Sequence, residues 1–150
     1  EGAGPVLEAI LRMTTMGMAV MGHLGLTPQS VHVFGGWDLR GANEKEAQRI
    51  KDDALRLQDA GVFSMVLEKI PVELAKEISE SLEVPTVGIA SGPHCDGQIL
   101  VSYDMFGLGP KMRFARRYLD GKQLIGDAVR QYIDDIRKHE FPSDDESFHA

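Results

Sequence analysis

Two residues that can carry out acid–base chemistry each stand at the end of a short apolar run. His23 follows residues 18–21 after a single glycine, and Glu68 directly follows residues 62–67. Short apolar runs of this kind are typical of buried strands. The carboxyl ends of parallel strands meet at one edge of a sheet, where α/β proteins place their sites. The pattern therefore predicts that both side chains reach the same open face.

Glu68 is the sharper candidate for catalysis. At the end of an apolar strand its carboxylate is expected to lie against apolar walls, where burial raises the pKa. A raised carboxylate pKa suits a general base that works near neutral pH. The alternative is structural, because Pro71 opens the next helix and the helix dipole stabilises a glutamate near a helix start. The residues by themselves leave both interpretations open.

His23 reaches the same edge through a glycine-containing loop. Gly22 is expected to turn the backbone at the end of the strand, and Thr27 followed by Pro28 marks the start of a helix. An imidazole in this position suits a functional site. It equally suits a loop histidine that caps or solvates the chain, and the local sequence does not decide between the two.

Two further groups of residues carry weaker signals. The turn Gly88–Gly92 would let a phosphate or a flat ligand approach closely, because glycines remove side-chain bulk. It lacks the lysine and the spacing of a phosphate-binding loop, and a tight turn explains it as well. The remaining histidines show no zinc-binding spacing; they are His32, His94, His139 and His149.

The elements that must position these residues alternate between helix and strand. Helices are expected over residues 5–16, 43–60, 71–82, 96–101, 114–119 and 123–138, and strands over 18–21, 62–67, 86–89 and 104–108. Residues 31–39 contain Gly35-Gly36 and are expected to form a hairpin, a mobile flap or a plain loop. The inner face of the last helix is expected to be Leu124, Ala128, Tyr132 and Ile136.

This alternation predicts βαβ units and a parallel α/β sheet. Four strands are too few for a closed (βα)8 barrel, and an isolated half would expose two sheet edges and one face. The chain also begins at Glu1 without a methionine. We therefore expect residues 1–140 to be the second, C-terminal half of a (βα)8 TIM barrel, completed by a missing N-terminal half. Residues 141–150 form an acidic C-terminal tail.

Composition limits the classes of partner. The chain has 150 residues and a formal net charge of −7, which argues against binding to nucleic acid or to an anionic membrane. The basic run 111–117 is expected to be a solvated helix face. No apolar run approaches the roughly 20 residues that span a bilayer, and no signal peptide is visible. A single cysteine, Cys95, excludes an internal disulfide and favours a cytoplasmic location.

Four motifs in the chain resemble those of the ketopantoate hydroxymethyltransferase (3-methyl-2-oxobutanoate hydroxymethyltransferase) family. The resemblance covers essentially the whole chain, with its motifs in the family's order. They are Gly22–Ser30 with Phe34-Gly35-Gly36, Val66–Glu68 with Pro71–Ala75, Asp96–Val101, and the tail around Glu146–Phe148.

The resemblance implies a (βα)8 barrel that forms higher homo-oligomers. It implies transfer of a hydroxymethyl group from 5,10-methylenetetrahydrofolate to 3-methyl-2-oxobutanoate, which forms ketopantoate for pantothenate and coenzyme A synthesis. The reaction would pass through a Mg²⁺-stabilised enolate, with Glu68 as the base, His23 as a substrate-binding residue and Glu1 as a magnesium ligand. Two aspartate ligands and a substrate-binding lysine of the family belong to the amino-terminal half.

One segment departs from the family pattern. Gly88–Gly92 reads Gly-Ile-Ala-Ser-Gly, where the family commonly has Gly-Ile-Gly-Ala-Gly. The added groups at Ala90 and Ser91 are expected to narrow the pocket for the folate. Two other interpretations stay open: a non-catalytic half-barrel that serves as an assembly module, and a related Mg²⁺-dependent lyase that cleaves a C–C bond of a 2-oxo acid.

Overall fold

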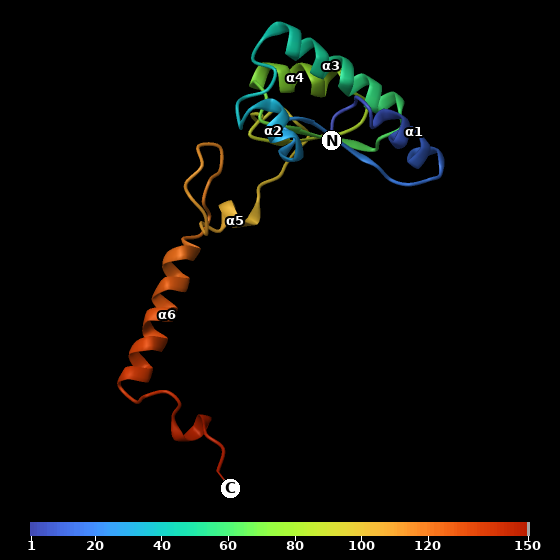
Figure 1. The fold of residues 1–150 in the computed structure, drawn as a ribbon. Coiled ribbons are helices and arrows are strands. Elements are labelled where there is room, and N and C mark those ends of the chain that lie inside the picture. The colour runs from blue at the N-terminus through green and yellow to red at the C-terminus, as the bar shows by residue number, and fades with distance from the viewer. Residues whose placement is uncertain (150) are drawn as a thin grey trace. The chain divides into compact units, whose positions relative to one another are not determined.

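The computed structural model describes residues 1–149, which divide into two compact units. The first unit is Glu1–Ile99, and the second begins at Leu100 (Figure 1). The sheet lies in the first unit. None of the described helices is both long enough and apolar enough to cross a membrane.

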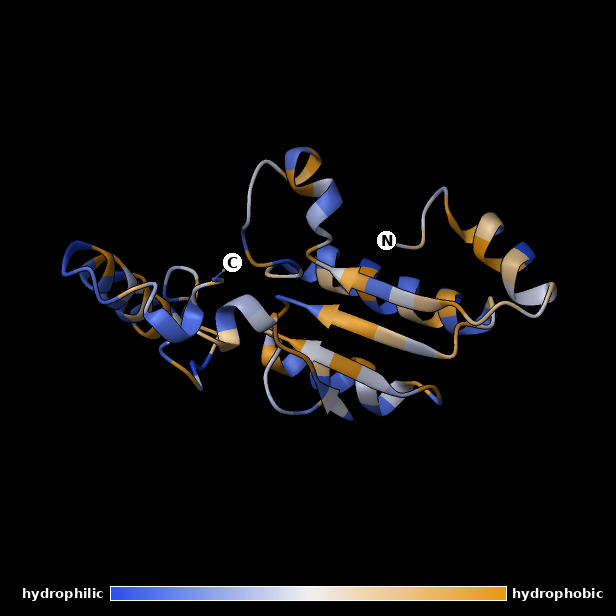
Figure 2. Cartoon of the chain, turned by 90° about the horizontal axis from the view of Figure 1, so that it is seen from below, coloured by the Kyte–Doolittle hydropathy of each residue, from blue (hydrophilic) through white to orange (hydrophobic). Residues whose placement is uncertain are grey.

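Four parallel strands form the sheet, in the order β1-β2-β3-β4. Figure 2 shows β1, β2 and β3 running in the same direction, with apolar residues along each of them. The pairing sets His23 opposite Val66, and Gly25 opposite Glu68. The prediction of a parallel sheet is confirmed and the number of strands is four, but the fourth strand is not the one predicted over residues 104–108. The strands are β1 (Met21–Gly25), β2 (Ser64–Glu68), β3 (Thr86–Ile89) and β4 (Gly97–Gln98).

Three helices accompany this sheet: α1 (Leu7–Thr15), α3 (Glu44–Asp59) and α4 (Val72–Ser81). Helices α3 and α4 lie on the same side of the sheet (Figure 1). Between these layers is a core of buried apolar side chains from both, including Leu24, Leu57, Met65, Leu67, Leu74 and Ile78. A Cβ at Gly22 would lie 3.2 Å from Leu57 Cδ1, so the glycine lets α3 approach β1 closely.

The opposite face of the sheet is less covered. Alternate residues of a strand point to opposite faces, so His23 and Val66, which are paired across β1 and β2, share the face opposite Leu24 and Leu67. Both are only partly buried. The sheet therefore has one face packed against helices and one face that remains partly open in the described residues.

Several elements match the sequence prediction closely. Asn43 caps α3, because its Oδ1 accepts a hydrogen bond of 2.9 Å from the Glu46 N–H. Gly61 follows this helix with a left-handed φ of +85°. Strand β2 ends on Glu68, and β3 has the predicted bounds.

Strand β1 differs from the prediction. It begins at Met21 rather than at Met18, so His23 lies inside the strand and not in the loop after it. Gly22 was expected to turn the chain, but it is a ladder residue that faces α3. The turn comes at Gly25, whose φ is +91°.

The segment after β1 is helical. A 3-10 turn, η1 (Pro28–Ser30), leads into the short helix α2 (Val31–Phe34). Gly35, with a φ of +79°, ends this helix. The hairpin considered for residues 31–39 is therefore wrong, and a loop follows α2 instead.

Three predicted elements beyond β3 are also wrong. Within residues 96–101, Gly97 and Gln98 form the edge strand β4 and no helix forms, because Asp96 Oδ2 accepts hydrogen bonds from the N–H and the hydroxyl of Thr86, at 2.7 and 3.0 Å. These bonds hold the segment along β3. The strand predicted over residues 104–108 overlaps helix α5 (Ser102–Met105), and residues 114–119 are irregular.

The second unit ends in helix α6 (Gly121–Arg137) and the 3-10 turn η2 (Asp144–Glu146). The helix is confirmed, but its expected inner face is exposed in the described chain, including Leu124, Tyr132 and Ile136. Tyr132 packs edge-on against Phe141, with ring centroids 5.5 Å apart. The basic run 111–117 is irregular rather than a helix face.

Candidate active site

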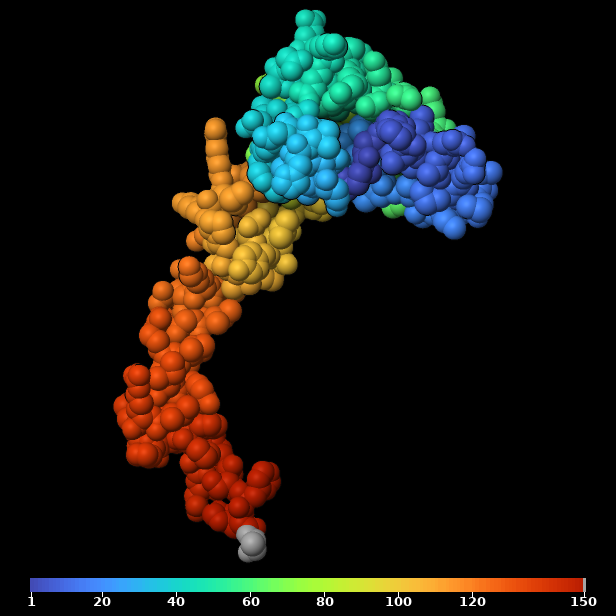
Figure 3. All heavy atoms as spheres, in the orientation of Figure 1, coloured from blue at the N-terminus to red at the C-terminus, as the bar shows by residue number. Residues whose placement is uncertain are grey.

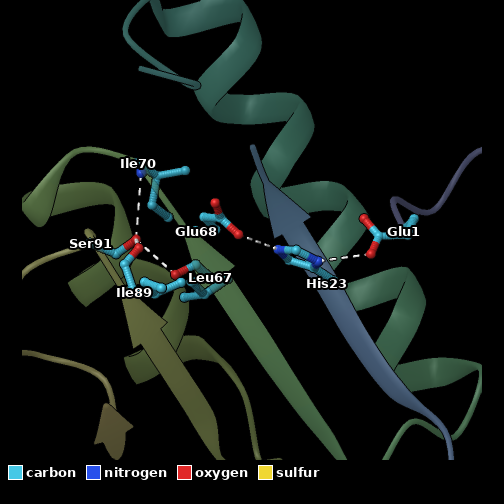
Figure 4. A network of polar contacts seen from close by, with 7 residues as sticks. All are labelled: Glu1, His23, Leu67, Glu68, Ile70, Ile89 and Ser91. Atoms are coloured by element: carbon cyan, nitrogen blue, oxygen red, sulfur yellow. Dashed lines mark hydrogen bonds and ion pairs between the residues drawn. The ribbon is translucent and has the colours of Figure 1, made fainter. Parts of the chain in front are cut away.

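The three residues singled out from the sequence lie together at the carboxyl edge of the sheet. His23 Nδ1 lies 3.1 Å from Glu1 Oε1, and His23 Nε2 lies 3.2 Å from Glu68 Oε2. The imidazole therefore stands between two carboxylates (Figure 4). The Gly2 N–H donates to the His23 carbonyl at 2.9 Å, which aligns the N-terminal segment with β1 and brings Glu1 to the site.

The two nitrogens of His23 differ in how well they are bonded. Nδ1 makes a hydrogen bond with Glu1. Nε2 is buried and has no aligned hydrogen-bond partner among residues 1–149, although Glu68 is close. A buried polar atom without a partner is unusual.

Burial dominates the electrostatics of Glu68. Desolvation raises the pKa of this carboxyl above its ordinary value, the nearby His23 imidazole opposes the rise, and the negative charge of Glu1 reinforces it. The side chain of Glu68 is 20% exposed, and that of Glu1 is 39% exposed. The more buried carboxyl suits proton transfer, and the more exposed one suits contact with a hydrated ion.

The backbone around Glu68 is held from both neighbouring strands. The Glu68 carbonyl accepts from the Leu26 N–H at 2.8 Å, and the Lys69 N–H donates to the Ile89 carbonyl at 2.9 Å. Lys69 has a left-handed φ of +50°. A Cβ at Gly25 would lie 2.1 Å from the Glu68 carbonyl oxygen, so this approach requires glycine.

The loop after α2 is fastened beside the same strand end. The Arg40 N–H donates to the Lys69 carbonyl at 3.0 Å, and Lys69 Nζ donates to the Trp37 carbonyl. The Arg40 guanidinium lies 4.0 Å from the centroid of the Phe34 ring and pairs with Glu46. Residues 37–40 therefore border the site, with the Trp37 side chain exposed.

In the turn Gly88–Gly92, the Ser91 side chain is buried and does not extend toward a ligand pocket as expected. Ser91 is 1% exposed, and its hydroxyl contacts the Leu67 and Ile89 carbonyls at 2.8 and 3.1 Å. It points into the protein, so the expected narrowing of the pocket by this side chain is wrong. Ala90 adopts a left-handed φ of +55°.

Sequence reasoning did not predict the contacts of two residues around the site. Gln29, with its amide nitrogen turned toward Glu1, donates to both carboxylate oxygens at 3.2 Å. Ser91 ties β2 to the turn after β3. Gln29 lies inside the family-like motif, but nothing in its type indicates this contact. A serine in a turn of small residues carries no signal for burial either.

Glu1 has the chemistry of a magnesium ligand, because Mg²⁺ prefers carboxylate oxygen and Glu1 presents a partly exposed carboxylate. The described residues contain no group of three or more His, Cys, Asp or Glu side chains placed to hold a metal ion. Glu1 therefore has the chemistry to supply one ligand to such a site but does not complete it. Among the other residues of possible chemical interest, Cys95 is a free, partly buried thiol.

A separate cavity of about 420 Å³ lies where the N-terminal segment and α2 meet on the surface of the first unit (Figure 3). It is lined by residues that include Ala3, Leu24, Thr27, Phe34, Arg49 and Ile50. Its lining does not include His23 or Glu68. The acid–base residues therefore lie outside this cavity.

These features define a parallel α/β protein with a glutamate–histidine–glutamate cluster at the carboxyl edge of its sheet. A family model described as ketopantoate hydroxymethyltransferase matches residues 1–144. The chain belongs to this family, as its motifs predicted.

Curated relatives named 3-methyl-2-oxobutanoate hydroxymethyltransferase agree with this assignment. The chain is 50% identical to the protein from Salinibacter ruber and 49% identical to that from Caldicellulosiruptor saccharolyticus, over 99% of this chain and 57% of each relative. It is 47% identical to the protein from Carboxydothermus hydrogenoformans, of which it covers 54%. The chain therefore spans little more than half the length of these relatives.

Proposed function

We propose that this chain provides part of the active site of a 3-methyl-2-oxobutanoate hydroxymethyltransferase. The reaction would transfer a one-carbon unit from 5,10-methylenetetrahydrofolate to 3-methyl-2-oxobutanoate and form ketopantoate. Membership of the family and the names of the relatives support this activity. The observation that carries the proposal is the placement of His23 between Glu1 and Glu68 at the carboxyl edge.

In this proposal Glu68 is the general base. The substrate has one hydrogen on C3, next to the keto group, and this proton must leave before C3 can attack the one-carbon unit. Burial raises the pKa of Glu68, and a carboxylate with a raised pKa binds a proton more tightly and is therefore a stronger base. Glu68 would take the C3 proton at its carboxylate oxygen.

His23 would orient the substrate. Its Nδ1 is engaged with Glu1, and its buried Nε2 lacks an aligned partner among the described residues. In this proposal Nε2 would be the ring nitrogen that contacts a bound oxo acid, because Nδ1 is already engaged. Because His23 also lies beside Glu68, a substrate held there would stand next to the base.

Glu1 would be one ligand of a magnesium ion. When bound, Mg²⁺ would act as a Lewis acid that withdraws electron density from the oxo acid and makes the neighbouring C–H more acidic. Magnesium takes near-octahedral oxygen coordination. Oxygen atoms from the substrate, from water and from a further protein segment would therefore have to bind the ion in addition to Glu1.

That further segment would also cover the open face of the sheet. His23 and Val66 point to this face, which the described helices leave partly exposed. The interior of a closed (βα)8 barrel buries such a face under side chains from all of its strands. We accordingly place this chain as the C-terminal half of a barrel.

The test is a product assay. The chain would be co-expressed with the part of the Salinibacter ruber relative that it does not match, and the purified complex would be supplied with 3-methyl-2-oxobutanoate, methylenetetrahydrofolate and Mg²⁺. We expect ketopantoate, and we expect none when the folate or Mg²⁺ is omitted. A soluble complex that makes no product would instead support an assembly module, and cleavage of an oxo acid without folate would support a lyase.

A further inference from the structure

We propose that Trp37 is a stacking surface for the folate co-substrate, an inference that rests on the proposed function. Trp37 lies in the loop between α2 and α3, and its side chain is 58% exposed. A tryptophan ring buries a large apolar area when it packs against another flat ring. The ligand would be a reduced pterin joined to an aminobenzoyl ring, which is the part of methylenetetrahydrofolate that carries the one-carbon unit.

The backbone of Trp37 is attached to the strand end that carries the base. Its carbonyl accepts a hydrogen bond from Lys69 Nζ, and Lys69 directly follows Glu68 at the end of β2. Further along the same loop, the Arg40 N–H donates to the Lys69 carbonyl at 3.0 Å. Two hydrogen bonds to one residue therefore hold the loop with Trp37 beside the carboxyl edge of the sheet.

The loop is also fastened to the helices on both of its sides. The Arg40 guanidinium lies 4.0 Å from the centroid of the Phe34 ring in α2 and pairs with Glu46 of α3. The Gly41 N–H donates to Glu46 Oε2 at 2.9 Å. A ligand that packs on a segment already held in place loses little binding energy to the ordering of that segment. With Arg40 engaged in this way, the loop offers a fixed aromatic ring rather than a free guanidinium.

The proposed reaction requires the folate at this edge of the sheet. Its one-carbon unit must meet C3 of the oxo acid, and C3 must lie within reach of the Glu68 carboxylate, which is turned toward His23 (Figure 4). The folate is much larger than the oxo acid, so its rings must extend past the loops that border Glu68. Residues 37–40 form one of these loops, and Trp37 gives it an exposed aromatic face.

Fluorescence can report on this residue directly, because Trp37 is the single tryptophan of the chain. The probe is 5-formyltetrahydrofolate, which keeps both ring systems but carries its carbon at a different oxidation level and cannot supply a hydroxymethyl group. The measurement uses the active complex of the product assay, and the emission that Trp37→Phe removes is assigned to Trp37. We expect this emission to fall as the probe binds, because a stacked pterin quenches indole fluorescence.

Kinetics compares Trp37→Leu with Trp37→Phe, because leucine is apolar but lacks a flat ring. For Trp37→Leu we expect KM for methylenetetrahydrofolate to rise about tenfold, with kcat and the KM for the oxo acid within about twofold. Trp37→Phe should keep the KM for the folate within about threefold of the wild type.

Phe63→Leu is the matched control. Phe63 is 54% exposed and directly precedes β2, so it is a similarly exposed aromatic residue at the opposite, amino edge of the same sheet. Its replacement should leave all of these constants within about twofold of the wild type. An equal rise of the KM for the folate in Trp37→Leu and Phe63→Leu would contradict the proposal.

Failure of this inference can be told apart from failure of the proposed function. Exchange of the C3 hydrogen of the oxo acid needs no folate, so its absence in the unaltered protein means that the proposed function fails. If that protein exchanges the hydrogen and binds the probe without a change in Trp37 emission, the role of Trp37 alone is rejected. Loss of complex assembly in Trp37→Leu would also overturn the role, since Trp37 would then be a contact with the other protein segment.

Discussion

His23 has an unusual position, with one carboxylate at each ring nitrogen. The two carboxylates are not equivalent, because Glu68 is the more buried of the two. Burial destabilises the ionised form of Glu68 and raises its pKa, while the imidazole partly compensates. One cluster can thus offer a proton acceptor and a separate carboxylate ligand, which is the combination that the proposed reaction needs.

The raised pKa of Glu68 predicts a pH-dependent stability difference for Glu68→Gln. A group whose pKa is higher in the folded state stabilises the fold below its unfolded pKa, and this contribution is lost as the pH rises through the folded pKa. Ionised Glu68 therefore costs stability near neutral pH, and the neutral amide does not. We expect the variant to melt at a higher temperature than the wild type at about pH 7, with the difference shrinking toward about pH 4.

Thermal unfolding at both pH values checks this expectation. Glu73→Gln, in the exposed first turn of α4, is a suitable control and should show no such gain. A Glu68→Gln protein that is less stable than the wild type at neutral pH would mean that the attraction of His23 outweighs burial.

At the residue scale, Glu68 was predictable because it ends the apolar run of β2, whereas His23 was expected after its strand and lies inside β1. Glu1 was placed by resemblance alone. Ser91 was beyond prediction from the sequence, since its burial depends on how the turn after β3 folds back on Leu67. A local pattern of small residues is compatible with many such turns.

At the scale of elements, the turn after β1 fixes how closely β1 and β2 approach at the site. Gly25 has a φ of +91°, and a Cβ there would lie 2.1 Å from the Glu68 carbonyl oxygen and 2.8 Å from Ile70 Cγ2. Any side chain must therefore push the end of β2 away. The Leu26 N–H bond to the Glu68 carbonyl would be lost or lengthened.

Gly25→Ala should accordingly destabilise the fold by at least about 2 kcal/mol, from backbone strain together with the clash. Chemical denaturation would measure the loss. Gly35→Ala is the control, because Gly35 also has a positive φ but a Cβ there meets nothing within 4 Å. Equal losses in the two variants would show that strain, and not the approach of Gly25 to Glu68, sets the cost.

Elements with strong local signals were predictable from the sequence. Helix α3 has an Asn43 cap, an apolar stripe and a terminal Gly61, and the structure has all three. Strand β1 was misplaced because Gly22 resembles a turn residue, whereas its role is to admit Leu57 of α3. A contact between separate segments has no signature in the local sequence. The hydrogen bonds from Thr86 to Asp96, beside β4, could not be predicted for the same reason.

At the scale of the whole molecule, the first unit has the layers of a partial barrel. Helices α3 and α4 cover one face of the sheet (Figure 1), and the face with His23 and Val66 stays partly open in the described residues. Family membership and the coverage of the relatives agree with this description. The sequence predicted the parallel sheet correctly, because alternation of helices and strands has few other solutions.

The second unit shows what hydrophobic periodicity in the sequence does not predict. The spacing of apolar residues predicted helix α6 correctly, since periodicity is a local property. It predicted burial of Leu124 and Tyr132, which are 55% and 52% exposed. Periodicity shows that a helix has an apolar face, but it does not show what that face packs against.

In the proposed reaction, Glu68 removes the proton from C3 of a branched 2-oxo acid. The most direct measurement is exchange of that hydrogen with deuterated water, followed by NMR, for the active protein and its Glu68→Gln variant in the presence of Mg²⁺ and without folate. We expect the variant still to bind 3-methyl-2-oxobutanoate but to exchange its C3 hydrogen at least about a hundredfold more slowly. Exchange at the wild-type rate would contradict it.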